Sequence, residues 1–353
     1  MNKVKIIVIV LIVAVAAAGA VYLNRGESGK KSSVIYEPVP GQQNSYFETD
    51  GKLAAANQDG LTVLDAAGSE HNSIVKSLAS PAASVSGSNR LFYDRNGTEI
   101  IYSRNGKNTE LKTDLPIITA KVNSTGYFAV ASMETGYKGK LEVYNEKASP
   151  IYKWQMGNDY VVDMDISADC RKMAVASLSM SGDTASAKID MIDLDKAEIA
   201  AECVLENAVP LAVVFTKSGI ANVVTDTGVT ALDKNGTEKW KIDFGDKIPE
   251  DFDIDASGVG AYKFAGAGNN SLIQIYSPSG QLTGEFKSEG TAVGFDNYGG
   301  LVAVAEGRKI VILDKTAKVK AELSAAFELR GVVVLSANTV AAIGGSAVSV
   351  INY

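Results

Sequence analysis

Apolar and polar positions alternate in a pattern that repeats about every 40 residues along most of the chain. Each unit holds an apolar strand, a turn with Asp, Ser or Gly, an Ala/Val-rich strand, a Gly turn, an apolar strand that ends in Asp, and a last strand. Two clear copies are Val161–Leu205 and Thr291–Leu323. A four-stranded unit repeated at this period is typical of a β-propeller, so the pattern predicts an all-β fold.

The number of units predicts the number of blades. We count eight units, and therefore expect eight four-stranded blades. They begin near Ser45, Ser80, Ile117, Tyr160, Val209, Glu250, Glu289 and Phe327. Seven blades are the alternative, and the second unit, which is the shortest and most polar, is where a miscount would fall.

The two ends of the repeat region complement each other. The chain stops at Tyr353, after the third strand of the eighth unit, so a fourth strand is missing there. At the other end Val34–Val39 is an extended segment that belongs to no unit. We expect this segment to supply the missing outer strand and close the ring. Pro38 is compatible with that place, because the outermost strand of a blade is a sheet edge.

An uncharged apolar segment, Ile6–Leu23, precedes the repeats. As a helix its 18 residues would be roughly 27 Å long, enough to cross the hydrocarbon core of a membrane. The sequence therefore predicts a single-pass anchor, with residues 1–5 in the cytoplasm, a linker at 24–33 and the propeller at 34–353 outside the cell membrane. The alternative is a signal peptide cleaved near Ala20, which would release a secreted protein.

Composition excludes some classes of function. The net charge of −7 argues against a nucleic-acid partner, because binding phosphates requires a basic surface. Cys170 and Cys203 are the two cysteines of the chain and form no CxxC motif, so neither a zinc site nor a disulfide framework is expected. His71 is the single histidine and lies in a polar stretch, which indicates an exposed turn rather than a His-based active site.

One unit carries a family signature. Gly228–Gly245 has a strand that ends Ala-Leu-Asp, a Gly turn, Trp240 and a closing Gly, and it resembles the repeat of quinoprotein-like (PQQ-like) propellers. Leu141–Gly157 is a fainter copy with Trp154. The chain has no WD dipeptide, so the resemblance to WD40 propellers is one of repeat pattern alone. The adjacent-cysteine pair typical of quinone-dependent dehydrogenases is missing too, and we expect no cofactor.

Together with the anchor, the repeats make the chain similar to the uncharacterised membrane-anchored propeller-like proteins of Gram-positive bacteria. That resemblance implies an architecture and a location, but no activity.

Four aspartates are the candidates for a metal or catalytic site. Asp163 and Asp165, and likewise Asp253 and Asp255, begin stretches that resemble calcium-binding loops. Both stretches lack the acidic residue at the twelfth position of such loops. We therefore interpret them as strands that run into β-turns, which Asp and Ser favour, and predict neither a metal site nor a catalytic residue.

The sequence favours a non-catalytic function. We expect an extracytoplasmic binding or scaffold module that offers a rigid surface to an envelope protein or polymer, with the membrane contacted through Ile6–Leu23. The alternative is a glycan-active hydrolase or lyase with its site at the centre of the ring. That alternative requires carboxylates to converge on the channel, and Asp163, Asp165, Asp253 and Asp255 are the candidates for them.

Overall fold

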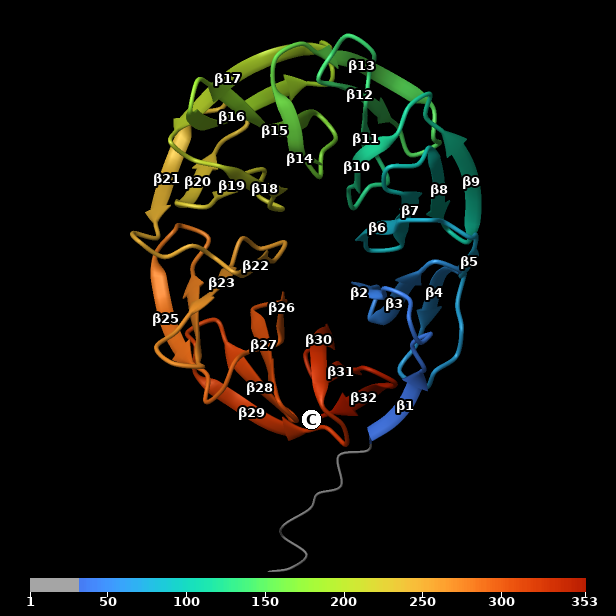
Figure 1. The fold of residues 1–353 in the computed structure, drawn as a ribbon, viewed down its shortest axis with the longest axis vertical. Coiled ribbons are helices and arrows are strands. Elements are labelled where there is room, and N and C mark those ends of the chain that lie inside the picture. Colours follow the sequence, from blue (N-terminus) through green and yellow to red (C-terminus); the bar gives the residue numbers. More distant parts are fainter. Residues whose placement is uncertain (1–31) are drawn as a thin grey trace, which may run out of the picture.

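The fold is a closed ring of β-sheets. The computed structural model describes residues 32–353, and all regular secondary structure in that range is β-strand. The strands form eight four-stranded antiparallel sheets around a central axis (Figure 1). The predicted eight-bladed propeller is therefore confirmed, and the alternative of seven blades is wrong.

The first seven blades each use four consecutive strands, ordered from the axis to the rim. Blade 1 comprises β2 (Ser45–Thr49), β3 (Lys52–Asn57), β4 (Gly60–Leu64) and β5 (Ile74–Val75), and blade 2 comprises β6 (Pro81–Ser86), β7 (Asn89–Asp94), β8 (Glu99–Arg104) and β9 (Lys107–Lys112). Blade 3 comprises β10 (Ile117–Val122), β11 (Phe128–Ser132), β12 (Gly139–Tyr144) and β13 (Pro150–Met156), and blade 4 comprises β14 (Tyr160–Ile166), β15 (Lys172–Ser181), β16 (Thr184–Asp193) and β17 (Glu198–Glu206). Blade 5 comprises β18 (Pro210–Phe215), β19 (Ala221–Thr225), β20 (Gly228–Leu232) and β21 (Glu238–Asp243). Blade 6 comprises β22 (Asp251–Ile254), β23 (Gly260–Ala265), β24 (Ser271–Tyr276) and β25 (Leu282–Lys287), and blade 7 comprises β26 (Gly294–Tyr298), β27 (Leu301–Glu306), β28 (Lys309–Asp314) and β29 (Val319–Ser324).

Blade 8 joins the two ends of the described chain. Its inner strands are β30 (Leu329–Ser336), β31 (Thr339–Gly344) and β32 (Val348–Asn352), and its outer strand is β1 (Ser32–Tyr36). The predicted closure by an N-terminal strand is confirmed, but the predicted bounds of Val34–Val39 need correction. Pairing runs from Ser32 opposite Ile351 to Tyr36 opposite Val348, so the strand ends before Pro38, which has no N–H to donate.

A polar residue at the end of the third strand closes the outer hairpin in six blades. Its side-chain oxygen accepts backbone N–H groups two to four residues further on, as Asp233 does from Asn235 and Thr237. The six residues in this role are Asp65, Asn145, Asp193, Asp233, Ser277 and Asp314. This local hydrogen bonding is why the repeat shows an apolar strand that ends in Asp.

The core lies between neighbouring blades. Second strands carry small, fully buried residues at alternating positions, such as Ala129 and Ala131 in β11 and Ala303 and Ala305 in β27. Third strands add larger aliphatic side chains, such as Ile310 and Ile312, that pack on the next blade. Because both sheet faces are covered, these strands are nearly continuous apolar runs rather than alternating ones.

The ring has two faces that differ in the turns they carry. We call the cavity face the one formed by the turns between first and second strands and between third and fourth strands. The far face is formed by the turns between second and third strands and by the connections between blades. Ser32 lies at the cavity face, because it pairs with Ile351 near the end of β32.

The predicted N-terminal anchor, Ile6–Leu23, lies outside the described residues. Among residues 32–353, no helix has the length and apolar character needed to cross a membrane. Cys170, in the turn after β14, and Cys203, in β17, are both free thiols.

Candidate functional site

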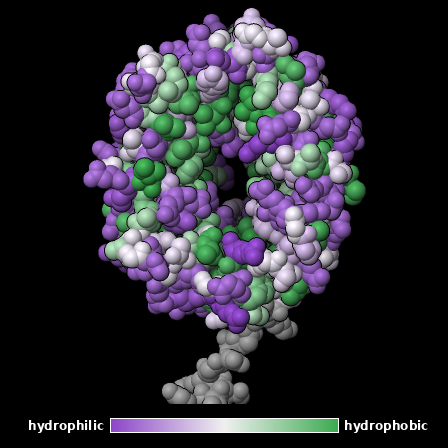
Figure 2. Space-filling view, viewed as in Figure 1, coloured by the Kyte–Doolittle hydropathy of each residue, from purple (hydrophilic) through white to green (hydrophobic). Residues whose placement is uncertain are grey.

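The inner strands surround a cavity at the centre of the ring. Its volume is about 980 Å³, and its wall is formed by residues from blades 1 to 7 on the cavity face. Figure 2 shows an opening at the middle of the molecule. The first strand of each blade has one edge free of sheet pairing, so backbone groups along that edge lack a ladder partner.

Three of the four aspartates singled out in the sequence lie on the wall of this cavity. Asp165, Asp253 and Asp255 line it, whereas Asp163 is buried on β14 two residues before Asp165 and is not part of the wall. The carboxylates from blades 4 and 6 thus converge on the channel. What each one binds decides whether they are available for chemistry.

The wall aspartates bind the backbone of neighbouring blades. Asp165 accepts the N–H of Phe215 in blade 5 at 2.7 Å, and Asp253 accepts the N–H of Asn297 in blade 7 at 2.9 Å. Asp296 accepts the N–H of Val334 in blade 8 at 2.6 Å. In all three cases the carboxylate satisfies a backbone donor of the next blade's unpaired inner edge. These groups therefore connect blades as well as line the cavity.

Lys121 on β10 compensates the charge of the blade 4 aspartates. Its Nζ lies 3.4 Å from Asp163, which also accepts the N–H of Val213 at 3.2 Å. Burial works to lower the pKa of Lys121, but Asp163 and Asp165 outweigh it, so the pKa is raised and the lysine stays charged. Burial raises the pKa of Asp165 to about 6, although Lys121 and the Phe215 N–H oppose the shift.

Asp253 and Asp296 form a second acidic pair, and within residues 32–353 neither forms an ion pair with a lysine. Burial, and then the charge of Asp296, raises the pKa of Asp253 to about 7, against the opposing effect of the Asn297 N–H. Burial likewise raises the pKa of Asp296, and its bonds to the Val334 N–H and to Asp253 limit the rise. Two carboxyl groups that share a buried site ionise one after the other, so this pair keeps a proton to a higher pH than an isolated aspartate would.

Asp255 stabilises a hairpin and a contact to the next blade. One carboxylate oxygen accepts the N–H groups of Ser257 at 2.8 Å and Val259 at 3.0 Å, and the other accepts the N–H of Gly300 in blade 7 at 3.0 Å. Within residues 32–353, no group of three or more His, Cys, Asp or Glu side chains is arranged to hold a metal ion. The hydrogen bonds of Asp255 support the interpretation of this stretch as a β-turn.

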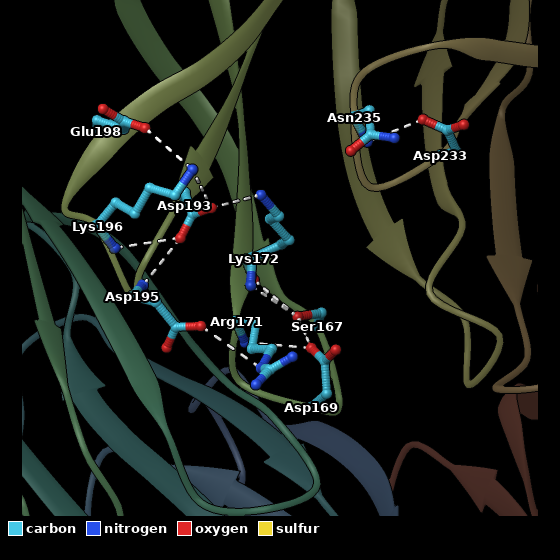
Figure 3. Close-up of polar contacts among 10 residues, drawn as sticks. All are labelled: Ser167, Asp169, Arg171, Lys172, Asp193, Asp195, Lys196, Glu198, Asp233 and Asn235. Carbon is cyan, nitrogen blue, oxygen red and sulfur yellow. Dashed lines mark hydrogen bonds and ion pairs between the residues drawn. The ribbon is translucent and has the colours of Figure 1, made fainter.

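The corresponding turn of blade 4 behaves in the same way (Figure 3). Ser167 donates its hydroxyl to Asp169 at 2.6 Å, and Asp169 also accepts the N–H of Arg171. Beside it Lys172 pairs with Asp193 at 2.9 Å across the sheet. These polar groups are occupied with each other and with the backbone of their own turns.

His71 lies in the outer hairpin of blade 1, as predicted for a turn residue. Its Nε2 is 2.9 Å from Asp65, and the hydrogen bond from His71 is the main reason that the pKa of Asp65 is lowered to about 2. The side chain is 42% exposed and does not line the cavity.

Sequence reasoning missed most polar residues of the wall, among them Glu48, Lys121, Asp296 and Asn297. Asp296 had a detectable signal, because Phe295-Asp296 matches Phe252-Asp253 in the preceding unit. In the register of the sheets, Asp253 pairs with Ala261 and Asp296 with Ala303 at equivalent places. Lys121 had no such signal, since no other inner strand has a lysine at that position.

Trp240, which carries the family signature, lies on the outer strand of blade 5 and is not part of the cavity wall. Its indole N–H donates to the carbonyl of Pro278 in blade 6 at 3.1 Å. The ring covers Gly280, where a Cβ would lie only 2.5 Å from Trp240 Cε3. This tryptophan therefore docks one blade on the next.

A family model matches residues 30–352, which is nearly the whole propeller. The chain belongs to the family of unknown function DUF5711. In the comparison with curated proteins, no sequence matches this DUF5711 chain.

Solved structures share the fold of this DUF5711 propeller at low sequence identity. The Cps50 (Swd1) β-propeller domain from Myceliophteria thermophila is 13% identical, with a TM-score of 0.52 over 92% of this chain and 100% of that one. BamB from Moraxella catarrhalis is 12% identical, with a TM-score of 0.55 over 92% and 98%. Sqt1 from Chaetomium thermophilum, bound to the N-terminus of the ribosomal protein L10, is 11% identical, with a TM-score of 0.60 over 91% and 100%. These similarities show a propeller fold that resembles WD40-like and PQQ-like proteins.

Proposed function

We propose that this chain is a membrane-anchored, extracytoplasmic propeller that binds an envelope protein or polymer without catalysing a reaction. The observation that carries the proposal is the use of the wall carboxylates. Asp165, Asp253 and Asp296 each accept a backbone N–H of the next blade, so the groups best placed for chemistry hold the ring together instead. A rigid ring offers a broad surface at little entropic cost on binding.

The proposed location rests on the apolar segment Ile6–Leu23 and on the resemblance to membrane-anchored propeller-like proteins of Gram-positive bacteria. The proposed binding role has support from the fold, because a propeller of similar architecture, Sqt1, has been solved with a protein N-terminus bound to it. At such low identity this support concerns what the architecture can do and names no partner.

Fractionation and protease accessibility test the location. The full-length chain should sediment with membranes and resist extraction with high salt, because about 18 apolar residues insert into the bilayer. Protease added to intact cells, after the cell wall is removed, should digest the propeller. A chain found in the soluble cytoplasmic fraction would contradict the proposal, and a chain found in the medium would favour cleavage near Ala20.

The cavity and two of its carboxyl groups support a second candidate function, that of a glycan-active hydrolase or lyase. The cavity of about 980 Å³ is large enough for sugar units, and Asp253 and Asp296 have raised pKa values. A carboxyl group that keeps its proton near neutral pH is what general acid catalysis needs. If this function is correct, purified chain releases reducing ends from envelope glycan, and Asp253→Asn lowers the rate at least about 100-fold. No release by the native chain would exclude it.

A further inference from the structure

The two faces of the ring differ in their exposed apolar side chains. Among residues 32–353, sixteen large apolar residues are exposed; of these Tyr298 alone lies at the cavity face, whereas seven lie on strands at the outer rim. The other eight lie on the far face: Val39, Met133, Tyr137, Tyr160, Met180, Val209, Ile248 and Val293. Most of these follow one another from blade 3 to the junction of blades 6 and 7. Tyr, Met and Ile exposed together in this way are typical of a docking surface.

The faces also differ in charge. In the loops of the far face, acidic residues outnumber basic ones by more than two to one. The acidic residues are Glu37, Asp59, Asp114, Glu134, Asp159, Asp183, Asp226, Asp246, Glu250, Glu289 and Glu328, and the basic ones are Lys76, Arg95, Lys138, Lys247 and Arg308. In the loops of the cavity face the two kinds are nearly balanced: Asp50, Asp65, Glu70, Glu146, Asp169, Asp195, Asp233 and Asp255 against Lys147, Arg171, Lys196, Lys217, Lys234, Lys315 and Lys318.

Within the apolar arc, by which we mean the exposed apolar side chains from blade 3 to the junction of blades 6 and 7, the two loop lysines contact aromatic rings. Asp159 and Glu250 pair with Lys188 and Lys263, but two other acidic residues have no such partner. Lys138 Nζ lies 2.7 Å from the Tyr160 hydroxyl and 4.5 Å from the centre of its ring, and Lys247 lies over the Phe264 ring at 5.8 Å. Asp183 and Asp246 are exposed and form no ion pair within residues 32–353. The arc therefore presents apolar side chains next to uncompensated negative charge.

The position of β1 decides which face is accessible. Ser32 enters the ring at the cavity face, so an anchored chain turns that face toward the membrane. The predicted linker runs over 24–33, and its part before β1, Asn24 to Lys31, can span at most roughly 29 Å. This inference about orientation rests on the proposed membrane anchor. It leaves the far face directed away from the bilayer and open to large partners.

We infer that the far face, over blades 3 to 6, docks a basic protein segment that carries apolar side chains. Apolar residues of the partner cover Tyr137, Tyr160, Met180 and Ile248, and its Lys or Arg residues meet Asp183 and Asp246. Complementary charge speeds and orients the encounter, and the buried aromatic and aliphatic contacts supply most of the affinity.

Site-specific photo-crosslinking in intact cells tests this inference with the full-length chain. A photoreactive amino acid is placed at Tyr137 or at Ile248, and in the control at Tyr298, the exposed apolar residue of the cavity face. We expect a protein adduct from the first two positions, at least about fivefold above the control, because only those positions lie in the interface. The partner segment, mapped by mass spectrometry, should carry an excess of Lys and Arg.

A charge reversal adds a matched comparison. With the photoreactive residue at Tyr137, Asp183→Lys should lower the adduct yield about threefold or more, because it repels a basic segment. Glu70→Lys makes the same change in charge on the cavity face and should leave the yield unchanged. Both variants must accumulate to the level of the parent chain.

Three results would overturn the inference: adducts from Tyr298 as strong as those from Ile248, a mapped segment that is acidic or is a glycan, or no adduct from either far-face position. Fractionation of the same cells tests the proposed membrane anchor separately from the docking surface. A soluble chain that keeps the crosslinking pattern refutes the anchor and leaves the docking surface standing. A membrane-bound chain without adducts refutes the docking surface alone.

Discussion

The junction between blades 5 and 6 and the next one, between blades 6 and 7, join their sheets by different means. The first has an aromatic core, in which the Phe244 ring lies 5.1 Å from the rings of both Tyr262 and Phe264. The second has an aliphatic core that includes Ile273 and Val304. Near the axis the second junction adds the hydrogen bond from Asn297 to Asp253, whereas blade 5 has Val214 at the place corresponding to Asp253.

At the rim, the two junctions fill the space between blades with side chains of different size. In the first junction the large Trp240 of blade 5 packs over Gly280 in the turn of blade 6. In the second, blade 6 has Gly284 at the place of Trp240, and the turn of blade 7 fills the space with Thr316 and Ala317. At the first junction a large residue on the strand packs against a small one in the turn. At the second junction a small residue on the strand packs against larger ones in the turn. Because the combined volume is kept, the units can diverge in sequence while the blades keep their spacing.

The largest expected effect comes from breaking the match at Gly280. Gly280→Ala would place a Cβ 2.5 Å from the rigid Trp240 ring, at a residue whose φ is +76°. We expect a loss of about 3 kcal/mol in the free energy of unfolding, because overpacking and backbone strain add. Urea denaturation followed by tryptophan fluorescence measures it.

Gly219→Ala is the matched control, since Gly219 has a φ of +79° and no neighbour within 4 Å of the added Cβ. It should cost about 1 kcal/mol from backbone strain alone. Equal losses for the two variants would show that the Trp240 contact contributes nothing to the junction.

The same change at the second junction should cost less. Gly284→Ala would bring a Cβ against the Thr316 carbonyl oxygen and within 2.8 Å of the Ala317 Cβ, but Gly284 lacks the positive φ of Gly280. We expect a loss of about 2 kcal/mol by the same measurement. Gly290→Ala, where an added Cβ meets no neighbour within 4 Å, should be nearly neutral. A larger loss for Gly284→Ala than for Gly280→Ala would show that the second junction tolerates an added methyl group less well than the first.

The free energy of unfolding should depend on pH through Asp253, which accepts the N–H of Asn297 at the second junction. The pKa of Asp253 is about 7 in the fold, against about 3.9 in an unfolded chain, so the ionised form disfavours folding. The penalty is absent below about pH 4 and complete above about pH 7. Asp253→Asn keeps a neutral acceptor for the Asn297 N–H and should stabilise the chain by about 1–2 kcal/mol at pH 8, with no gain at pH 4. Urea denaturation curves at both pH values measure this gain in stability. A gain of equal size at pH 4 would contradict the raised pKa of Asp253 as its cause.

The smallest effect should follow from Trp240→Phe. This change keeps an aromatic ring over Gly280 and removes the hydrogen bond from the indole N–H to Pro278. We expect a loss of about 1 kcal/mol in the free energy of unfolding, the usual net contribution of one hydrogen bond. A loss as large as that for Gly280→Ala would mean that the hydrogen bond, rather than the fit of ring and glycine, dominates the junction.

Local features of the chain made the blades predictable. Strand periodicity and the polar residue, most often Asp, that closes the outer hairpin of six blades act over a few residues. They are enough to predict eight units and a closing N-terminal strand. The roles of the wall residues are not local. Asp165 binds Phe215, 50 residues away, and the glycine that Trp240 covers lies 40 positions further on, in the next unit. The turn interpretation of Asp255 is supported by its bonds, but its additional hold on Gly300 follows only from the closed ring.

Ring closure through β1 also determines how the molecule would respond to tension. Any pull on the residues before Ser32 reaches the ring through one edge strand of five residues, Ser32–Tyr36, which pairs with β32 alone. A pull along the strand axis shears all the backbone bonds of this pair together, whereas a pull outward from the rim opens them one at a time, beginning at Ser32. The direction of the load, more than the stability of the eight sheets, therefore sets the force at which the circle opens.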